Sequence, residues 1–212
     1  MRWLGYRASA LVVLAALASA MPAGSATEPI HVTMLGDSVA DSLQYMPSAE
    51  QLLQQGYAVR FDLRVCRRLA SSGCPFQGTV PSSALVAIRD DGSSLGDVLV
   101  VDVGYNDDPA LYRAGMDQVI HAAHVLGVKR VVWVTLRASW QAFRATNAVI
   151  VSEAKKFPQV TVADWNAWSA GKPWFRPDGL HLTGAGATAL ARFLRPFLAQ
   201  AATEIRAATA TS

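Results

Sequence analysis

The sequence predicts a single α/β domain in which helices cover both faces of a parallel sheet. Two observations lead to this prediction. Short runs rich in Val, Ile and Leu alternate along the chain with longer stretches of helical periodicity. One of these runs, residues 97–104, is almost continuously apolar, which is typical of a strand buried on both of its faces. The 212 residues, of which 51% are hydrophobic, suffice for one domain with a substantial core.

Five segments are expected to form the strands of this sheet. Most of them are short and rich in β-branched residues, and the second alternates apolar with polar residues, as a strand near the edge of a sheet does. The five segments are residues 30–35, 57–65, 97–104, 128–136 and 159–165.

Helical segments follow the strands, and turn or capping residues mark their ends. Ser48 and Gln51 have the spacing of a capping box, and Gly56 stops the helix that they begin. Asp108 and Pro109 are residue types favoured at the first positions of a helix. The expected helices are residues 48–55, 81–92, 108–127, 139–157 and 183–202, and Pro196 is expected to kink the last of them.

The beginning of the chain has the features of a secretory signal peptide. Arg2 and Arg7 form a positively charged start, and residues 8–20 form an apolar stretch that is short for a membrane span. We therefore expect a signal peptide at residues 1–26. An uncleaved anchor at the same place is the alternative.

Cleavage of this segment would leave a nearly neutral domain. Small residues suited to cleavage end at Ala20 and at Ala26, and both sites stay open. Without residues 1–26 the chain has 17 basic and 16 acidic residues, so the net charge of +3 falls to about +1. This balance gives no indication of nucleic-acid binding. No later apolar run reaches the length of a membrane span, so we expect residues 27–212 to be soluble or only peripherally attached.

The chain has two cysteines, Cys66 and Cys74, which lie close together. An exported protein meets an oxidising compartment, so we expect a local disulfide that rigidifies the loop between them. A structural zinc site would need further ligands, and no histidine lies near the pair. A pair of free thiols is the alternative.

Chemically active residue types follow three of the expected strands. Residues 36–38 (Gly-Asp-Ser) follow the first strand, residues 104–107 (Gly-Tyr-Asn-Asp) the third, and residues 178–181 (Asp-Gly-Leu-His) the fifth. Taken alone, Ser38 could simply be the N-cap of the next helix. The carboxyl ends of parallel strands meet at one edge of the sheet, where open α/β sheets bind their ligands. The convergence of the three groups therefore favours an active site.

The three groups resemble the sequence blocks of the SGNH, or GDSL, hydrolases. GDSV at residues 36–39 resembles the nucleophile block of that family, GYND at 104–107 its Gly-x-Asn-Asp block, and DGLH at 178–181 its Asp-x-x-His block. The blocks occur in the right order and the resemblance covers nearly the whole domain. It implies the SGNH hydrolase fold, a flavodoxin-like three-layer α/β/α sandwich with a mostly parallel, five-stranded sheet.

The resemblance also implies a role for each residue. Ser38 is the expected nucleophile, because a serine hydroxyl attacks an ester once a base takes its proton. His181 is that base, and Asp178 orients its ring and stabilises the imidazolium that forms. The oxyanion hole of the family uses the N–H of the serine, the N–H of a glycine and an asparagine side chain. These correspond to Ser38, one glycine and Asn106, while Asp37 is expected to bond the backbone around the nucleophile.

The glycine of the oxyanion hole has two candidates. Gly73 and Gly78 both lie between the second strand and the helix that follows it. Gly78 is favoured because it comes just before the helix expected to start near Pro81, with its N–H near the cleft. Gly73 lies between the two cysteines, where it would permit the turn of their loop.

Substrate contacts are expected from residues at the same edge of the sheet. Tyr105 lies inside the GYND block, and Trp174 lies in a loop before the DGLH block. Packing beneath a loop is the alternative for Trp174. Arg137 follows the fourth strand and is a candidate contact for a polar substrate.

No cofactor or metal ion is expected. His121 and His124 lie three apart on an expected helix, but no carboxylate or cysteine completes a metal site, so we interpret them as surface histidines. The glycines of residues 184–189 follow no strand, so they indicate close helix packing and not a dinucleotide site.

These features together predict an exported serine esterase that hydrolyses carboxylic esters through an acyl-serine intermediate. Short acyl groups such as acetyl, carried on carbohydrate or cell-envelope material, are the expected substrates. The alternatives are an acyltransferase that passes the acyl group to a sugar hydroxyl, a lipase or thioesterase, and lastly a catalytically silent carbohydrate-binding protein. We expect a monomer, secreted or held in the cell envelope, that acts on a small-molecule or glycan ester.

Overall fold

The computed structural model describes Met1 and residues 28–211, and its centre is a five-stranded sheet. Every strand pairs in parallel with its neighbours, in the order β2-β1-β3-β4-β5. The strands are β1 (Ile30–Gly36), β2 (Tyr57–Leu63), β3 (Val98–Asp102), β4 (Arg130–Val134) and β5 (Val160–Ala163). The predicted α/β fold is therefore confirmed, and its sheet is wholly parallel. The signal peptide expected at residues 1–26 lies, beyond Met1, outside the described residues.

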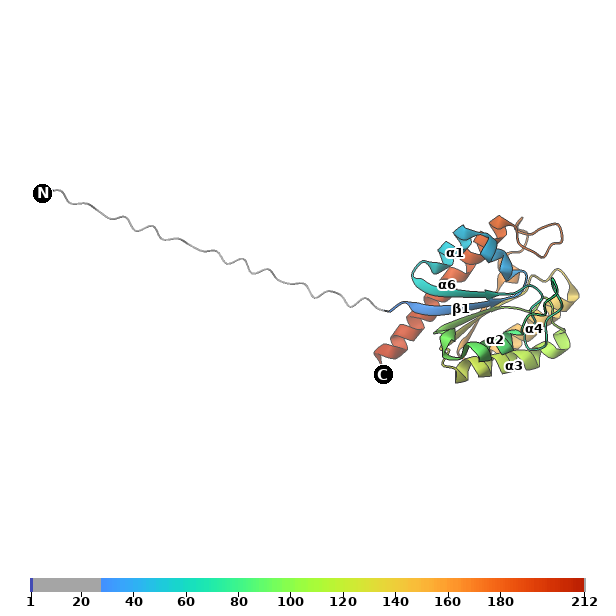
Figure 1. Cartoon of the computed structure of the whole chain (residues 1–212), viewed down its shortest axis with the longest axis horizontal. Coiled ribbons are helices and arrows are strands. Elements are labelled where there is room, and N and C mark those ends of the chain that lie inside the picture. The colour runs from blue at the N-terminus through green and yellow to red at the C-terminus, as the bar shows by residue number, and fades with distance from the viewer. Residues whose placement is uncertain (2–27, 212) are drawn as a thin grey trace.

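Helices cover both faces of the sheet, as Figure 1 shows. One face carries α1 (Pro47–Gln54) and α6 (Gly184–Ala210), and the other carries α2 (Ala84–Asp91), α3 (Pro109–Val125) and α4 (Gln141–Ala154). Three short elements complete the described chain, namely η1 (Ala40–Tyr45), η2 (Gly92–Leu95) and α5 (Trp165–Trp168).

Each face of the sheet packs its own hydrophobic core. Met34 and Val132 belong to the core beneath α1 and α6, whereas Leu35 and Trp133 belong to the core beneath α2, α3 and α4. Neighbouring residues of a strand point to opposite faces, so β1 and β4 each supply both cores. All four side chains are almost fully buried. This double burial explains why these strands are continuously apolar in sequence.

Some helix ends differ from the predictions. α1 begins at Pro47 and no side chain caps it, so the capping box expected at Ser48 and Gln51 is wrong. Proline is suited to a first helical position, because its fixed φ fits the helix and no partner is needed for an N–H. The last helix, α6, continues past residue 202 to Ala210, with Pro196 inside it.

Two other helix starts follow the capping rule. Asp108 accepts the N–H of Ala110 at the start of α3, as its residue type predicted. Ser83 accepts the N–H of Val86 at the start of α2. A capping side chain thus marks the point at which each of these helices begins, after the loop that follows β2 or β3.

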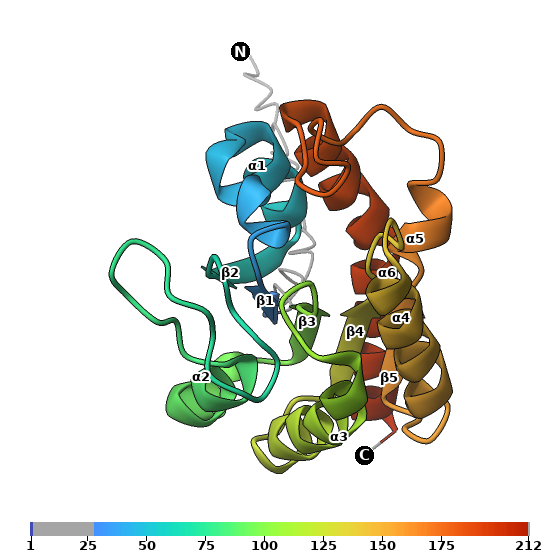
Figure 2. The ribbon, with the colours of Figure 1, turned by 90° about the vertical axis from the view of Figure 1, so that its right-hand side faces the viewer.

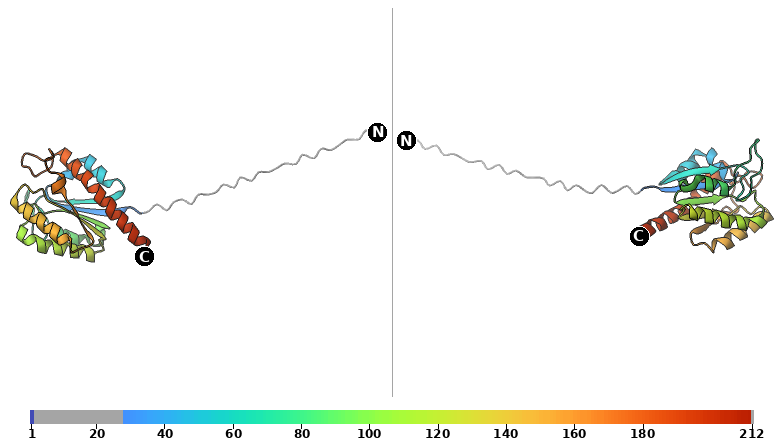
Figure 3. Two further views of the ribbon diagram at one scale, coloured as in Figure 1. Left: turned by 180° about the vertical axis from the view of Figure 1, so that it is seen from behind. Right: turned by 60° about the horizontal axis from the view of Figure 1, so that its bottom comes forward.

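Figure 2 looks onto the edge of the sheet at which the strands end, and the loops after them gather there. The described ends of the chain lie on the opposite side, where residues 28–31 and residues 205–210 border one shallow hollow. Figure 3 shows α6 running away from the edge at which the strands end, toward that side. Among the described helices, none combines the length and the apolar character that a membrane crossing requires.

Candidate active site

Ser38 lies in a tight turn at the end of β1. At Gly36 an added Cβ atom would lie 2.4 Å from the Cβ of Ala40 and 2.6 Å from a methyl carbon of Leu63. Only glycine therefore allows η1 and β2 to come this close to the turn. Ser38 follows it and is partly buried, and within residues 28–211 its backbone N–H donates no hydrogen bond.

Asp37 holds this turn against the loop that follows β3. Its fully buried carboxylate accepts the backbone N–H groups of Val39, Gly104 and Tyr105, each at 3.1 Å. Burial raises the pKa of Asp37 to about 6, although these N–H groups act in the opposite direction. The expected structural role of Asp37 is confirmed by these contacts, which fix Ser38 relative to the GYND segment.

Replacing Asp37 with asparagine is expected to destabilise the protein in a pH-dependent way. The NH₂ group of the asparagine would face at least one of the three N–H donors, which would then lack an acceptor. The variant is therefore less stable already at pH 7. Between about pH 6 and pH 4 the folded wild type takes up a proton at Asp37 before the unfolded chain does, which stabilises the wild type alone. The deficit in unfolding free energy should therefore grow by about 2–3 kcal/mol from pH 7 to pH 4.

Urea unfolding of both proteins at several pH values measures this deficit. Asp102 and Asp107, whose pKa values burial also raises, titrate in both proteins, and the charge of Asp107 is the smallest of the influences on the pKa of Asp37. A deficit that stays constant or shrinks on acidification would contradict the expected protonation of Asp37.

Asp178 and His181 lie in a short turn between α5 and α6. The N–H of Gly179 donates to the carbonyl of Arg176 at 2.8 Å, and the N–H of Arg176 donates to the carbonyl of His181 at 2.7 Å. Gly179 has a φ of 69°, which glycine adopts without strain. Asp178 in turn accepts the N–H groups of Leu180 and His181 at 2.8 and 2.9 Å. The DGLH segment is thus folded around its own carboxylate.

This turn brings the expected acid, base and nucleophile into contact. His181 Nε2 lies 3.1 Å from Ser38 Oγ, and His181 Nδ1 lies 2.9 Å from Asp178 Oδ2. The backbone N–H of Leu180 and the His181 ring lower the pKa of Asp178 to about 2, so the carboxylate stays ionised at neutral pH. An ionised Asp178 favours the tautomer with its proton on Nδ1, which leaves Nε2 to accept the proton of Ser38.

The start of α6 packs against the segment before α1 and so holds the turn that contains His181 in place. The side chain of Thr183 caps α6 by accepting the N–H of Gly186 at 3.1 Å. At Gly184 an added Cβ would lie 2.9 Å from the sulfur of Met46, so the helix packs closely against the segment before α1. The glycines here therefore serve helix packing, as predicted, and they set the position of His181.

Asn106 lies on the loop after β3, where it meets the loop after β2. Its Nδ2 donates to the carbonyl of Arg67 at 3.2 Å, and its own carbonyl accepts from Arg68 Nε at 2.8 Å. Asp107 accepts the N–H of Leu69 with both carboxylate oxygens, at 3.0 and 3.1 Å. These contacts join the two loops. An amide carries two hydrogens, so Asn106 keeps one for a ligand.

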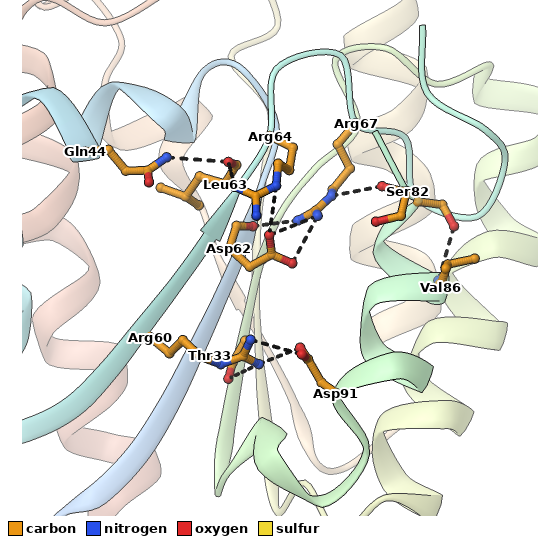
Figure 4. A network of polar contacts seen from close by, with 11 residues as sticks. Thr33, Gln44, Arg60, Asp62, Leu63, Arg64, Arg67, Ser82, Val86 and Asp91 are labelled. Carbon is orange, nitrogen blue, oxygen red and sulfur yellow. Dashed lines mark hydrogen bonds and ion pairs between the residues drawn. The ribbon is translucent and has the colours of Figure 1, made fainter. Parts of the chain in front are cut away.

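A buried arginine, which the sequence analysis did not single out, holds the loop after β2 in place (Figure 4). Arg67 is 1% exposed, and its guanidinium donates to both carboxylate oxygens of Asp62 at 3.0 Å. It also donates to the carbonyl of Ser82, close to the start of α2. Arg67 therefore connects the two ends of this loop.

The structure does not support the prediction of Gly78 for the oxyanion hole by any contact with Ser38 or Asn106 within residues 28–211. Gly78 lies at the exposed tip of a hairpin in which Phe76 and Thr79 exchange both backbone hydrogen bonds. Its φ of 78° serves that two-residue turn. At Gly73, the other candidate, an added Cβ would lie 2.6 Å from the ring of Pro81, so its role is close packing.

The turn of residues 64–67 lies between β2 and α2, in the segment where the glycine of the oxyanion hole was expected. Arg64 donates its N–H to the carbonyl of Gly36 at 3.1 Å, at the end of β1. The carbonyl of Arg67 accepts from Asn106, so this turn borders both Asn106 and the segment that leads to Ser38. We name it the 64–67 turn.

Cys66, within the 64–67 turn, forms the predicted disulfide with Cys74. Its φ of 66° is uncommon for a residue with a side chain. The N–H of Cys74 also donates to the carbonyl of Cys66 at 3.1 Å. The disulfide therefore restrains a strained position next to Arg67, whose carbonyl contacts Asn106.

Replacing both cysteines with serine is expected to lower the unfolding free energy by about 2–3 kcal/mol, the loop-closure entropy of so short a bridge. Turnover should also fall several-fold, because the 64–67 turn loses a restraint. Urea unfolding and ester hydrolysis, each with and without a thiol reductant, measure both effects. The double variant is its own control, since it should not respond to reductant. An unchanged unfolding free energy would contradict this expectation.

Tyr105, which was predicted to contact the substrate, is mostly buried, and its substrate contact stays a prediction. It is 9% exposed, its hydroxyl accepts the N–H of Arg137 at 2.7 Å, and its ring packs edge-on against Phe143. Trp174 is partly buried and stacks on Trp165 with 5.8 Å between ring centres. Trp174 therefore packs beneath its loop with part of its ring, and its predicted substrate contact stays a prediction. Both side chains support the loops around the triad.

His121 and His124 are exposed on α3, on the far side of the sheet from α1 and α6. In the part of the chain that the structure describes, no three His, Cys, Asp or Glu side chains are grouped as a metal site would need.

The fold of this chain is shared with solved esterases, although scans of protein-family models and of curated proteins found no match. The psychrotrophic esterase EstA from Pseudoalteromonas sp. has a TM-score of 0.62 at 8% identity, over 80% of this chain and 97% of that chain. The family 3 carbohydrate esterase of Clostridium thermocellum has a TM-score of 0.52 at 17% identity, over 78% and 93%. A protein of Agrobacterium tumefaciens described as an arylesterase has a TM-score of 0.64 at 13% identity, over 81% and 99%.

Proposed function

We propose that this chain, which has the fold of the SGNH hydrolases, is a serine esterase of that family that hydrolyses carboxylic esters. The contact of Ser38, His181 and Asp178 at the carboxyl edge of the sheet is the observation that carries the proposal. Three solved structures of similar fold are described as esterases. EstA is described as inhibited by monoethylphosphonate, a tetrahedral compound that resembles the intermediate of ester hydrolysis.

The proposed reaction has two halves that use the same three residues. His181 Nε2 takes the proton of Ser38 while Oγ attacks the ester carbonyl, and the proton then passes to the alcohol oxygen as its bond to the carbonyl breaks. The acyl group is now an ester of Ser38. Water, which loses a proton to His181, attacks that ester and releases the acid, and Ser38 regains its proton. Asp178 stabilises the imidazolium in both halves.

Fixed N–H donors are needed for the oxyanion that forms in each half. Among residues 28–211, the N–H of Ser38 has no hydrogen-bond acceptor and the Asn106 amide keeps one hydrogen free, so both are suited to this role. We assign the remaining backbone donor to the 64–67 turn, in place of Gly78, because this turn borders both residues. Each such donor typically contributes about 10²–10³ in rate.

Short acyl groups on carbohydrate are the proposed substrates. One protein of similar fold is a carbohydrate esterase. The triad is also open, because the side chains of His181 and Asp178 are 36% and 47% exposed. An open site accepts an ester group that is one small substituent of a large glycan.

The proposed localisation is outside the cytoplasm, either secreted or in the cell envelope, after removal of residues 1–26. The disulfide between Cys66 and Cys74 supports it, because disulfides persist in oxidising compartments. We propose that the domain acts there as a monomer, without a cofactor.

Hydrolysis of 4-nitrophenyl esters from acetate to decanoate tests the proposal, with protein that lacks residues 1–26. We expect rapid turnover of the shortest esters and a decline with chain length. Maximal activity on decanoate would favour the lipase alternative. Absence of hydrolysis at every length, in protein shown to be folded by circular dichroism, would contradict the esterase proposal.

An acyltransferase is the second candidate, because the open triad also allows a sugar hydroxyl to reach the acyl-serine. Transfer and hydrolysis differ only in which hydroxyl attacks that intermediate. Mass spectrometry of the products, formed with and without an added sugar acceptor, separates the two. More acylated sugar than free acid would favour transfer.

A further inference from the structure

Arg137 lies between the two segments that carry Asn106 and His181. It follows β4, and its backbone N–H donates to the hydroxyl of Tyr105, the residue before Asn106, at 2.7 Å. Its guanidinium carbon lies 3.6 Å from the centre of the Phe175 ring. Phe175 forms an isolated backbone bridge with the residue that follows His181. In Figure 2 the loop after β4 accordingly lies between the loop after β3 and the segment that leads from α5 to α6.

The guanidinium of Arg137 has no polar protein partner among residues 28–211. It forms no hydrogen bond or ion pair there, and its Nε is buried without an acceptor. Most buried donors in folded proteins are paired, so this one needs an explanation. Arg67, the other arginine buried near the site, is fully engaged with Asp62 and backbone carbonyls. Arg137 is instead held by an aromatic face alone.

Two further arginines add positive charge on the same side of the site. Arg144, in the first turn of α4, donates to the carbonyl of Ala138, and Arg176 donates to the carbonyl of Leu182. Neither forms an ion pair with an acid of the described chain. Asp178, the acid of the same turn as Arg176, is engaged with the catalytic histidine. Within residues 28–211, none of these three arginines is therefore paired directly with a carboxylate.

We infer that Arg137 binds a carboxylate of the ester substrate, so that the enzyme prefers anionic esters. This inference rests on the proposed esterase function and names its substrate class. A guanidinium presents its N–H groups in a planar fork that matches the two oxygens of a carboxylate. The guanidinium lies over the Phe175 ring, and its two terminal nitrogens, which have no partner among residues 28–211, are not buried as Nε is, so they remain open to a ligand. Arg137 contacts Tyr105, the neighbour of Asn106, and Phe175, which pairs with the neighbour of His181, so a carboxylate bound to it would lie on the same side of the site as the reacting ester.

Either half of the ester can carry such a carboxylate. On the acyl side it belongs to a half-ester of a dicarboxylic acid, and on the alcohol side to an acylated uronic acid or a related acidic sugar. The test therefore has two arms. Each arm compares an anionic ester with its neutral counterpart.

The acyl arm compares 4-nitrophenyl hydrogen glutarate with 4-nitrophenyl pentanoate, and the alcohol arm compares acetylated methyl glucuronide with acetylated methyl glucoside. We expect the wild type to favour the anionic ester of one arm by at least about tenfold in kcat/KM. Arg137→Met should reduce this preference by about 10- to 100-fold, the usual effect of losing hydrogen bonds to a charged group. Arg137→Lys keeps the charge without the fork and should lose less.

Arg89→Met is the matched control. Arg89 is exposed in the last turn of α2, away from the edge at which the strands end, so its loss should leave the preference unchanged. Absence of an anionic preference in both arms would overturn the inference. An equal loss of activity on both esters in Arg137→Met would do so as well, because it would reveal a merely structural role.

Binding measurements separate this inference from the proposed function. Calorimetry with Ser38→Ala protein measures the affinity for the same four esters without turnover, and Arg137→Met is then added to that variant. If Arg137→Met weakens binding of the anionic ester and leaves binding of the neutral ester unchanged, the inference is supported. This holds even if the wild type hydrolyses no ester, a result that would reject only the esterase proposal. Hydrolysis that depends on Ser38, without selective anionic binding, would reject the inference alone.

Discussion

Replacing Ser38 with alanine is expected to lower the turnover of a short ester by on the order of 10⁶. The variant lacks the oxygen that forms the acyl-enzyme, and His181, 3.1 Å from that oxygen in the wild type, has no serine proton to take. The rate that remains would come from the oxyanion donors and from substrate binding. Initial rates with 4-nitrophenyl acetate at high enzyme concentration measure the loss.

Ser42→Ala is the matched control for this change. Ser42 belongs to the same GDSVADS segment but lies in η1, and we expect its variant to keep turnover within about twofold. A fluorophosphonate reagent gives a second readout, because it should label a peptide containing Ser38 in the wild type and in the control. Turnover that survives in folded Ser38→Ala, or labelling at another serine, would contradict the assignment of the nucleophile.

Replacing Asp178 with asparagine is expected to lower turnover by about 10⁴. The change preserves the shape of the side chain and removes its charge, and an amide can present a donor where His181 Nδ1–H needs an acceptor. The imidazole then adopts the wrong tautomer for accepting the proton of Ser38. Measurement of kcat and KM should show the loss in kcat, because Asp178 contacts the base and not the substrate.

Asp108→Asn is a suitable control, because asparagine caps a helix as well as aspartate does and Asp108 only caps α3.

The pKa of Asp178 near 2 also bears on acid inactivation. Its carboxylate stays ionised from neutral pH down to about pH 3, so any loss of activity between pH 7 and pH 5 comes from another group. The stability that its lowered pKa contributes is present above about pH 4 and is lost only as pH falls toward 2. Asp178→Asn with near wild-type kcat would contradict the assigned role.

The sheet and the triad were predictable because local residue patterns mark them. The run at 97–104 identifies β3 by its continuous apolar character. Ser38, Asn106 and His181 each follow an element whose end lies at the same edge, so the parallel topology alone brings them together. The position of these residues at one site could therefore be predicted although they lie far apart in the sequence.

The loop between β2 and α2 was not predictable in the same way. It has no periodicity, so Gly78 was favoured for its residue type and its place before a helix. The structure uses Gly78 for a hairpin tip and gives the left-handed position beside the site to Cys66, which a disulfide restrains. Arg67 was overlooked because a charged residue indicates a solvent-exposed position until its buried partner Asp62 is known.

Burial of the aromatic residues also depends on tertiary packing. Tyr105 lies inside a catalytic block, yet its ring is covered by Phe143 of α4, which lies far along the chain. Trp174 is covered in the same way by Trp165. A sequence pattern places such residues near the site, but only the neighbouring elements decide whether they reach its surface.

The contact between Ser38 and His181 spans 143 positions of the chain. The nucleophile lies near the beginning of the domain, whereas its base is held by the start of α6, the last element. A chain that is still being synthesised, or whose α6 has not docked, has a serine without a base. On the proposed mechanism, the protein is therefore inactive until its final helix is in place. On the proposed export route, such latency spares the esters of the producing cell until the protein has reached its destination and completed its fold.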